Sequence, residues 1–180
     1  MSEREIFALP VPVSDSDHVR GRDSATVTVV KYGDFESVEC HRSHRLMRKA
    51  AALLDSKMKF VYRHFPLINV HSHALLAAEA AEAAAAQGKF WEMHDRLFGN
   101  PAKLEVKHLK HHAKKIGLDT DRFEQELTSR FYSANVQASY RASLLGGITG
   151  SPTFYINGVR YDATSDTQRL IEYISTLEQT

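Results

Sequence analysis

The chain has 180 residues, of which 43% are hydrophobic, and its 23 lysines and arginines against 22 acidic residues leave a formal net charge of +1. This length and hydrophobic content suit one core, so we expect a single domain. A net charge so close to zero provides no field that would attract nucleic acid or an anionic membrane, and neither is expected as a partner.

The first fifteen residues contain acids, prolines and few apolar positions, so they lack the basic start and apolar stretch of a secretory signal. The alanine-rich stretch at 77–86 carries Glu79 and Glu82 and is too short to cross a bilayer. The single cysteine, Cys40, cannot form an internal disulfide, which suits a reducing compartment. We therefore expect a soluble, cytoplasmic protein; the alternative is the mature form of an exported protein whose leader has been cleaved.

Residues 1–24 are expected to form an N-terminal arm, and residues 25–180 the single folded domain. β-branched residues at 25–32 predict a buried strand, which is followed by a helical pattern at 38–56. A second strand is expected at 59–65, and its short helical separation from the first predicts a parallel βαβ unit.

Helix-forming residues occupy the middle of the chain. Gln87-Gly88-Lys89 divides the segment 73–98 into two helices. Further helices are expected at 105–116, 121–130 and 133–145. We therefore expect an all-helical insertion at about residues 67–146.

Strand character returns at 153–156 and 159–161, and Asn157-Gly158 between them is a strong signal for a two-residue hairpin. A last helix is expected at 167–177. The order βαβ, helical block, ββα is that of a thioredoxin with helices inserted between its halves. We therefore predict an α/β protein with a thioredoxin fold and an all-helical insertion.

Specific motifs narrow this expectation. Tyr32-Gly33-Asp34-Phe35-Glu36, followed by a four-residue motif that opens a helix, resembles the strand-to-active-site segment of the DsbA-like thiol–disulfide oxidoreductases. The residues at 65–67, 71–74 and 87–95 resemble the insertion of that family, and 147–154 resembles its loop with a cis-proline. The resemblance runs from about residue 17 to the C-terminus.

The resemblance implies an active site that this chain has altered. The family motif is usually Cys-Pro-x-Cys, and its positions fall here on Ser37-Val38-Glu39-Cys40, so the exposed, attacking position is a serine. A dithiol cycle needs a second thiol to release the mixed disulfide, and this chain alone cannot complete it. The residues for which the resemblance implies catalytic roles are Ser37, Cys40 and Pro152. Those for which it implies contacts to substrate are Val38, Glu39, Thr149 and Ser151.

Three functions remain open. The one we favour is an enzyme of thiol–disulfide oxidoreductase type that uses the single thiol of Cys40, with glutathione as co-substrate and no tightly bound cofactor. The second is a glutathione-dependent transferase or isomerase in which Ser37 donates a hydrogen bond to a thiolate, as in the kappa-class glutathione transferases. The third is a non-catalytic peptide-binding or chaperone-like domain. In each, an extended peptide or small thiol would lie in a groove beside Pro152.

Structural roles compete with these functions. Ser37 is a good N-cap, and a free cysteine such as Cys40 often packs as a small hydrophobe. Nearby acids disfavour a thiolate at Cys40, and nearby basic residues are expected to offset them in part. The acids are Asp34, Glu36 and Glu39, and the basic residues are His41, His44 and Arg45.

Ten histidines raise the question of a metal site. Cys40 with His44, His71 with His73, and the run at 108–112 have spacings that can share an ion, but no closed set of four ligands appears. The sequence therefore predicts no metal site.

Overall fold

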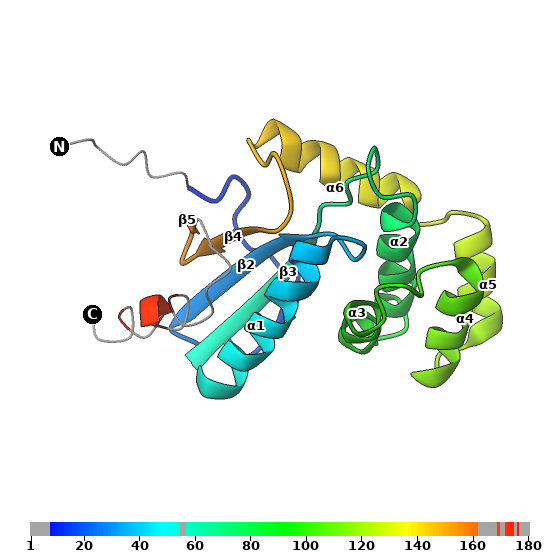
Figure 1. The fold of residues 1–180 in the computed structure, drawn as a ribbon, viewed down its shortest axis with the longest axis horizontal. Coiled ribbons are helices and arrows are strands. Elements are labelled where there is room, and N and C mark those ends of the chain that lie inside the picture. Colours follow the sequence, from blue (N-terminus) through cyan, green and yellow to red (C-terminus); the bar gives the residue numbers. More distant parts are fainter. Residues whose placement is uncertain (1–7, 55–56, 162–168, 170–171, 175, 177–180) are drawn as a thin grey trace.

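The computed structural model describes residues 8–54, 57–161, 169, 172–174 and 176. Within these residues one mixed sheet has the strand order β1-β3-β2-β4-β5. β2 and β3 are parallel, and the other neighbouring pairs are antiparallel (Figure 1). The strands are β1 (His18–Arg20), β2 (Val27–Gly33), β3 (Met58–His64), β4 (Thr153–Ile156) and β5 (Val159–Tyr161).

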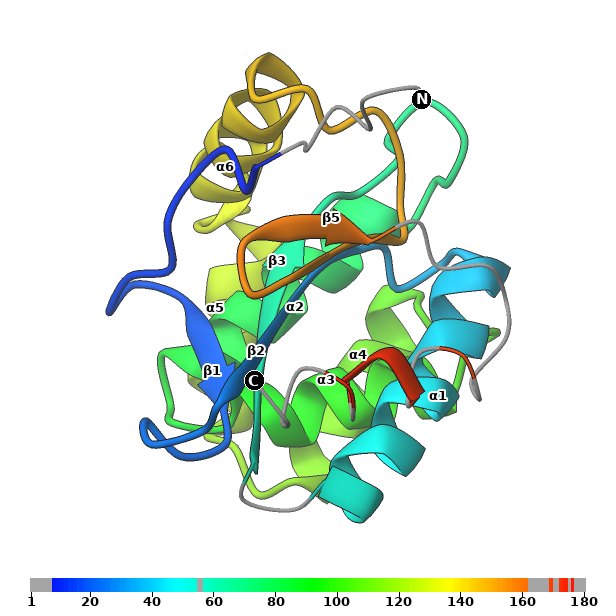
Figure 2. The same cartoon turned by 90° about the vertical axis from the view of Figure 1, so that its left-hand side faces the viewer.

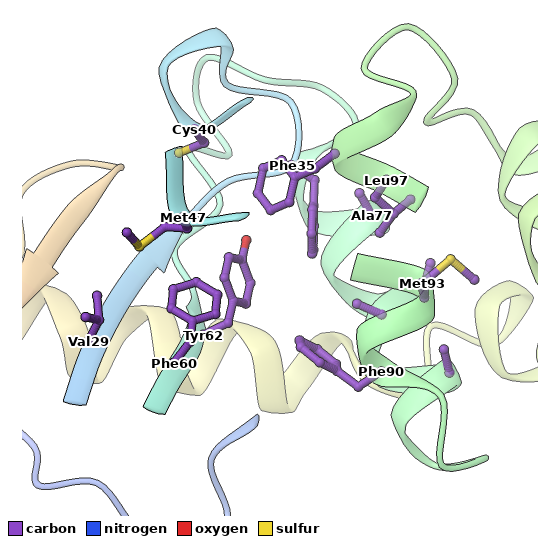
Figure 3. Packing of buried hydrophobic residues seen from close by; sticks show 14 of the residues in the cluster. Val29, Phe35, Cys40, Met47, Phe60, Tyr62, Ala77, Phe90, Met93 and Leu97 are labelled. Carbon is purple, nitrogen blue, oxygen red and sulfur yellow. The ribbon is translucent and has the colours of Figure 1, made fainter. Parts of the chain in front are cut away.

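Helix α1 (Val38–Leu54) connects β2 to β3 and lies across one face of the sheet (Figure 1). Its apolar positions recur at helical spacing and are buried, among them Met47, Ala50 and Leu54. They pack in one cluster with strand residues such as Val29 and Phe60 (Figure 3). The predicted βαβ unit is confirmed.

The insertion consists of five helices, of which α2, α3, α4 and α5 lie together beside the sheet (right in Figure 1; Figure 2 turns the view by 90°). They are α2 (Ala74–Ala85), α3 (Phe90–Gly99), α4 (Val106–Lys115), α5 (Thr120–Thr128) and α6 (Ser133–Leu145). The alanines of α2 are small enough to let α3, α5 and α6 all pack against it. None of the helices within the described ranges is long and apolar enough to span a bilayer.

The opposite face of the sheet carries a second, smaller core. Alternate residues of β2 point to it, including Val30 and Tyr32. Phe65, directly after β3, contacts Tyr140 of α6 at a ring-centroid distance of 4.8 Å. Helix α6 therefore belongs to the insertion in sequence and covers the second face of the sheet in space.

The predicted thioredoxin fold with an all-helical insertion is confirmed, with one difference in the N-terminal arm. His18, Val19 and Arg20 form an edge strand that pairs with β3, so part of the expected arm belongs to the sheet. Trp91, on α3, stabilises this strand by donating a hydrogen bond from Nε1 to the Val19 carbonyl at 2.9 Å. Most of the helix expected at 167–177 lies outside the described residues.

Candidate functional site

The candidate site lies where β2 ends and α1 begins. Tyr32 near the end of β2 pairs with Thr153 at the start of β4, so the register sets Pro152 opposite Gly33. The Ser151–Pro152 peptide bond is cis, as the family resemblance implies. The fold thus brings the proline loop to the strand end that leads into the Ser37–Cys40 motif, although the two are separated by more than one hundred residues of sequence.

Ser37 caps helix α1. Its Oγ accepts a hydrogen bond from the Cys40 amide at 3.3 Å, which satisfies one of the free amides of the first turn. The side chain is only 4% exposed, whereas the next residue, Val38, is 60% exposed. The expectation of an exposed serine was therefore wrong, because the residue packs in the first turn of α1 with its oxygen engaged as a cap. The Ser37 hydroxyl proton has no acceptor within the described part of the chain.

Cys40 is fully buried in the first turn of α1. Its Sγ accepts a hydrogen bond from the Asp34 amide at 3.4 Å and packs within the main core (Figure 3). The thiol has no direct contact with solvent. The interpretation of Cys40 as a small core residue is therefore confirmed for its packing, and any thiol chemistry would require the first turn to open.

Lys31 lies directly behind Cys40, and our sequence analysis did not identify it. It is completely buried, its Nζ donates a hydrogen bond to the Cys40 carbonyl at 3.0 Å, and it sits 4.4 Å from the centre of the Phe98 ring. Burial lowers the pKa of Lys31 to about 8, against an opposing effect of the Cys40 thiol. A lysine in the middle of an apolar strand was the signal that could have revealed it.

The two acids before Ser37 anchor the loop to the segment after β3. The Asp34 carboxylate is buried and accepts hydrogen bonds from the amides of Glu36 and Leu67 and from the His71 ring, at 2.7–2.8 Å. Glu36 accepts from the His73 amide at 2.7 Å. His71 and His73 therefore pair with carboxylates of this loop, and these hydrogen bonds tie the loop to the segment that follows β3.

Two histidines of α1, His41 and His44, lie behind the site. His44 is buried, and this burial lowers its pKa to about 4 with further lowering by the nearby charge of Lys31, so the ring is neutral at pH 7. The expectation that His44 offsets the acids was wrong for this reason. The two ring nitrogens of His41 each lie 2.7 Å from a carbonyl oxygen, those of Phe98 and Phe35, so this ring joins the site loop to the end of α3.

The remaining predicted contact residues differ in exposure. Val38 and Glu39 are exposed on the first turn, and Glu39 pairs with Arg42 at 3.2 Å. Thr149 is exposed, while the Ser151 Oγ, next to the cis-proline, is buried without a hydrogen-bond partner within the described residues.

Comparison with known proteins agrees with this geometry. A family model described as Thioredoxin matches residues 14–176, and the chain belongs to that family. Among solved structures, oxidised BdbD from Bacillus subtilis superimposes with a TM-score of 0.82 at 21% identity, covering 98% of this chain and 100% of BdbD. α-DsbA1 from Wolbachia pipientis gives 0.80 at 19% identity, covering 94% of each chain. The resemblance to DsbA-like proteins is thus confirmed at the level of the fold.

Curated relatives are more similar in sequence and much longer. The Na(+)/H(+) antiporter NhaA 3 of Salinispora tropica is 44% identical over 158 residues, which are 87% of this chain and 24% of the relative. The NhaA 1 antiporter of Mycolicibacterium vanbaalenii is 37% identical over 162 residues, with 87% and 26% covered. The chain spans about a quarter of the length of these relatives, so the similarity concerns one region of each.

Proposed function

We propose that this chain is a thiol–disulfide oxidoreductase-like protein that holds the sulfur of a bound thiol, such as glutathione or a cysteine-containing extended peptide, against Ser37 and beside Pro152. The observation that carries the proposal is the hydrogen-bonding state of Ser37. Its oxygen is occupied by the Cys40 amide, so the cap fixes the hydroxyl in place and leaves its proton free to donate. Membership of the thioredoxin family supports a ligand that contains sulfur.

The chemistry follows from the charges around this hydroxyl. When the bound thiol loses its proton to solvent, the thiolate accepts the Ser37 hydrogen bond, and a hydrogen bond to a charged acceptor contributes about 1.5–3 kcal/mol. This corresponds to a lowering of the ligand's thiol pKa by roughly one to two units. The start of α1 and the buried Lys31 add positive potential on the same side, which opposes the negative charge of Asp34, Glu36 and Glu39. The site therefore favours the thiolate, the form in which sulfur attacks disulfides.

Two variants of Ser37 separate donation from capping. Ser37→Ala removes both the donor and the cap, whereas Ser37→Gly removes the donor, adds no charge and weakens the cap by only a few tenths of a kcal/mol. We expect both to weaken binding of glutathione at pH 8 by about 10-fold or more, the factor that corresponds to the lower end of a charged hydrogen bond. Isothermal titration between pH 6 and 9 measures this, with the distant Ser129→Ala as control. Unchanged affinity in Ser37→Gly would contradict the proposal.

The same experiment tests the other two functions. Cys40→Ser should leave glutathione binding intact; if the native protein forms a mixed disulfide with oxidised glutathione that Cys40→Ser abolishes, the single-thiol mechanism applies instead. In that step the Cys40 thiolate attacks one sulfur of the disulfide and releases glutathione thiolate. Peptide binding that survives changes at both positions would indicate a non-catalytic domain.

A further variant, Ser37→Cys, restores the second cysteine of the family motif. Ser37→Cys should convert the motif to Cys-x-x-Cys and produce insulin reduction above the native level, and Ser37→Cys combined with Cys40→Ser should remove that gain. Failure of a folded Ser37→Cys protein to reduce insulin would mean that Cys40 does not occupy the inner corner of a redox loop.

A further inference from the structure

Three potential metal ligands from separate elements converge at the β1 edge of the sheet. His18 comes from β1, His64 is the last residue of β3, and Glu82 lies on α2. One carboxylate oxygen, Glu82 Oε1, is 2.7 Å from His18 Nε2 and 2.8 Å from His64 Nε2. The ligand atoms all lie within 4.8 Å of one another. The cluster is separate from the Ser37 site, which uses none of these side chains.

The two rings are held in orientation by packing. His18 stacks on Phe90 with a centroid distance of 3.5 Å and an interplanar angle of 8°. His64 is buried, and its ring meets that of Tyr62 edge-on at 5.4 Å. The other nitrogen of His64, Nδ1, is buried and has no partner within the described residues. Nε2 is therefore the ring nitrogen that His64 presents to the cluster, where it lies 2.8 Å from Glu82 Oε1.

The cluster borders a cavity of about 300 Å³, lined by all three side chains together with residues that include Tyr32, Arg63 and Ser139. The charge of Arg63 is balanced by Asp17, because the Arg63 guanidinium donates two hydrogen bonds to the Asp17 carboxylate at 2.7 and 2.8 Å. The Glu82 carboxylate is therefore not neutralised by a lysine or arginine in the cavity wall, and the local potential suits a cation.

We propose that His18, His64 and Glu82 bind a divalent transition metal ion of the zinc class, with one coordination position facing the cavity. Two imidazole nitrogens and one carboxylate oxygen are the donors used in zinc sites that retain an exchangeable water. Bonds of about 2.0–2.1 Å in a tetrahedral site separate neighbouring ligand atoms by about 3.3 Å. The present separations of 2.7 and 2.8 Å thus need to widen by only about half an ångström, which side-chain rotation supplies.

A second cluster of three potential metal ligands does not suit a cation, and its surroundings show why. His44, His94 and Asp95 also bring their ligand atoms within 4.8 Å of one another. There, however, Arg20 lies 2.9 Å from the Asp95 carboxylate and neutralises it. The charges of Lys31 and Arg48 also act on His44. A cation would meet net positive charge, so the ligand set alone does not make a metal site.

The test uses the full chain freed of metal with a chelator and titrated with Zn²⁺ alone. We expect one high-affinity Zn²⁺ per chain. Replacing a residue that only hydrogen-bonds to a metal ligand lowers metal affinity by about 10–100-fold. Loss of a direct ligand in His18→Gln or Glu82→Gln should therefore weaken Zn²⁺ binding by at least that factor. The matched control is His111→Gln, an exposed histidine on α4 that should leave the affinity unchanged. Equal losses in the control, or no loss in either cluster variant, would overturn the proposal.

A measurement on the native protein covers the case in which the cluster variants do not fold. X-ray absorption of the zinc-loaded chain should show two imidazoles and no sulfur in the first shell, and Co²⁺ in place of Zn²⁺ should give the intense visible bands of a four-coordinate ion. A sulfur ligand would indicate Cys40, and more than two imidazoles would indicate surface histidines; either result contradicts the proposed site. Glutathione binding to metal-free protein tests the Ser37 proposal separately.

Discussion

Lys31 and Ser37 show how single side chains set the electrostatics of the candidate site. The Lys31 amino group is buried, and it donates a hydrogen bond to the Cys40 carbonyl at the start of α1. Ser37 occupies the first turn of the same helix and satisfies an amide there. A buried cation behind the helix start and a fixed hydroxyl at its front both favour negative charge on a bound ligand.

The buried charge of Lys31 should cost stability in a defined pH range. Its folded pKa of about 8 lies below the ordinary value of 10.5, so the unfolded chain binds more protons between these values and stability rises with pH there. The cost, about 3 kcal/mol for a shift of this size, is fully present below pH 8. We expect Lys31→Met to be more stable than the native protein at pH 7, with the difference shrinking by about that amount toward pH 10.5.

Urea unfolding of both proteins at several pH values measures this difference, and groups common to both cancel. Lys49→Met, an exposed replacement on α1, controls for the loss of a lysine as such. A difference between native and Lys31→Met that stays constant from pH 7 to 10.5 would show that the amino group is not desolvated as the structure indicates.

At the scale of single residues, the sequence identified candidate site residues only where they belong to a recognisable family motif. Ser37, Cys40 and Pro152 were found through the family resemblance, and their proximity follows from the fold. Lys31 was missed although a charge within an apolar strand is unusual. His18, His64 and Glu82 carry no local signal, because the residues of a cluster built from three elements have no characteristic spacing.

Individual elements were predictable where local chemistry decides them. Asn157-Gly158 forms the expected hairpin with both residues at positive φ, and α6 begins and ends at the expected residues. β1 was missed because a three-residue edge strand depends on its partner, here β3, more than on its own sequence. Elements that need a distant partner are therefore the ones that sequence patterns omit.

A buried ion pair joins α2 to the turn between α5 and α6. Glu79 is 1% exposed, and its two carboxylate oxygens accept hydrogen bonds from Arg130 at 2.6 and 2.8 Å. The pairing raises the pKa of Arg130. Arg130→Ala should leave the carboxylate buried and unpaired, and we expect a loss of about 1–3 kcal/mol in unfolding free energy, moderated by the partial exposure of the arginine.

Chemical denaturation checks this against Lys107→Ala, which removes an exposed pair with Glu105 at the start of α4. We expect only a small change in that control, because exposed pairs contribute little. If the two variants lose equal stability, the Glu79–Arg130 pair does not fasten the helices of the insertion.

At the scale of the whole molecule, β1 links the sheet to the insertion through two polar pairs, His18 with Glu82 and Arg20 with Asp95. Asp17, just before β1, pairs with Arg63 of β3. Burial alone would raise the pKa of Asp95, but hydrogen bonds from His94 and Arg20 lower it to about 2. A carboxyl group with a depressed folded pKa contributes stability above its ordinary pKa of 3.8 and loses it toward the folded value. The Arg20–Asp95 pair therefore remains intact until the solution is strongly acidic.

The buried histidines should respond earlier, as pH falls below 6.5. Burial lowers the pKa of His44 to about 4 and that of His94 to about 3, so between these values and 6.5 the unfolded chain binds more protons and stability falls as the solution is acidified. A shift of the size found for His44 corresponds to about 3 kcal/mol. His44→Phe, which keeps a ring against Phe98, should remove this part of the acid sensitivity between pH 6.5 and 4, whereas exposed His111→Gln should leave the native profile unchanged. If the stability profiles of the native protein and His44→Phe run parallel, protonation of His44 is not the cause of the loss of stability between pH 6.5 and 4.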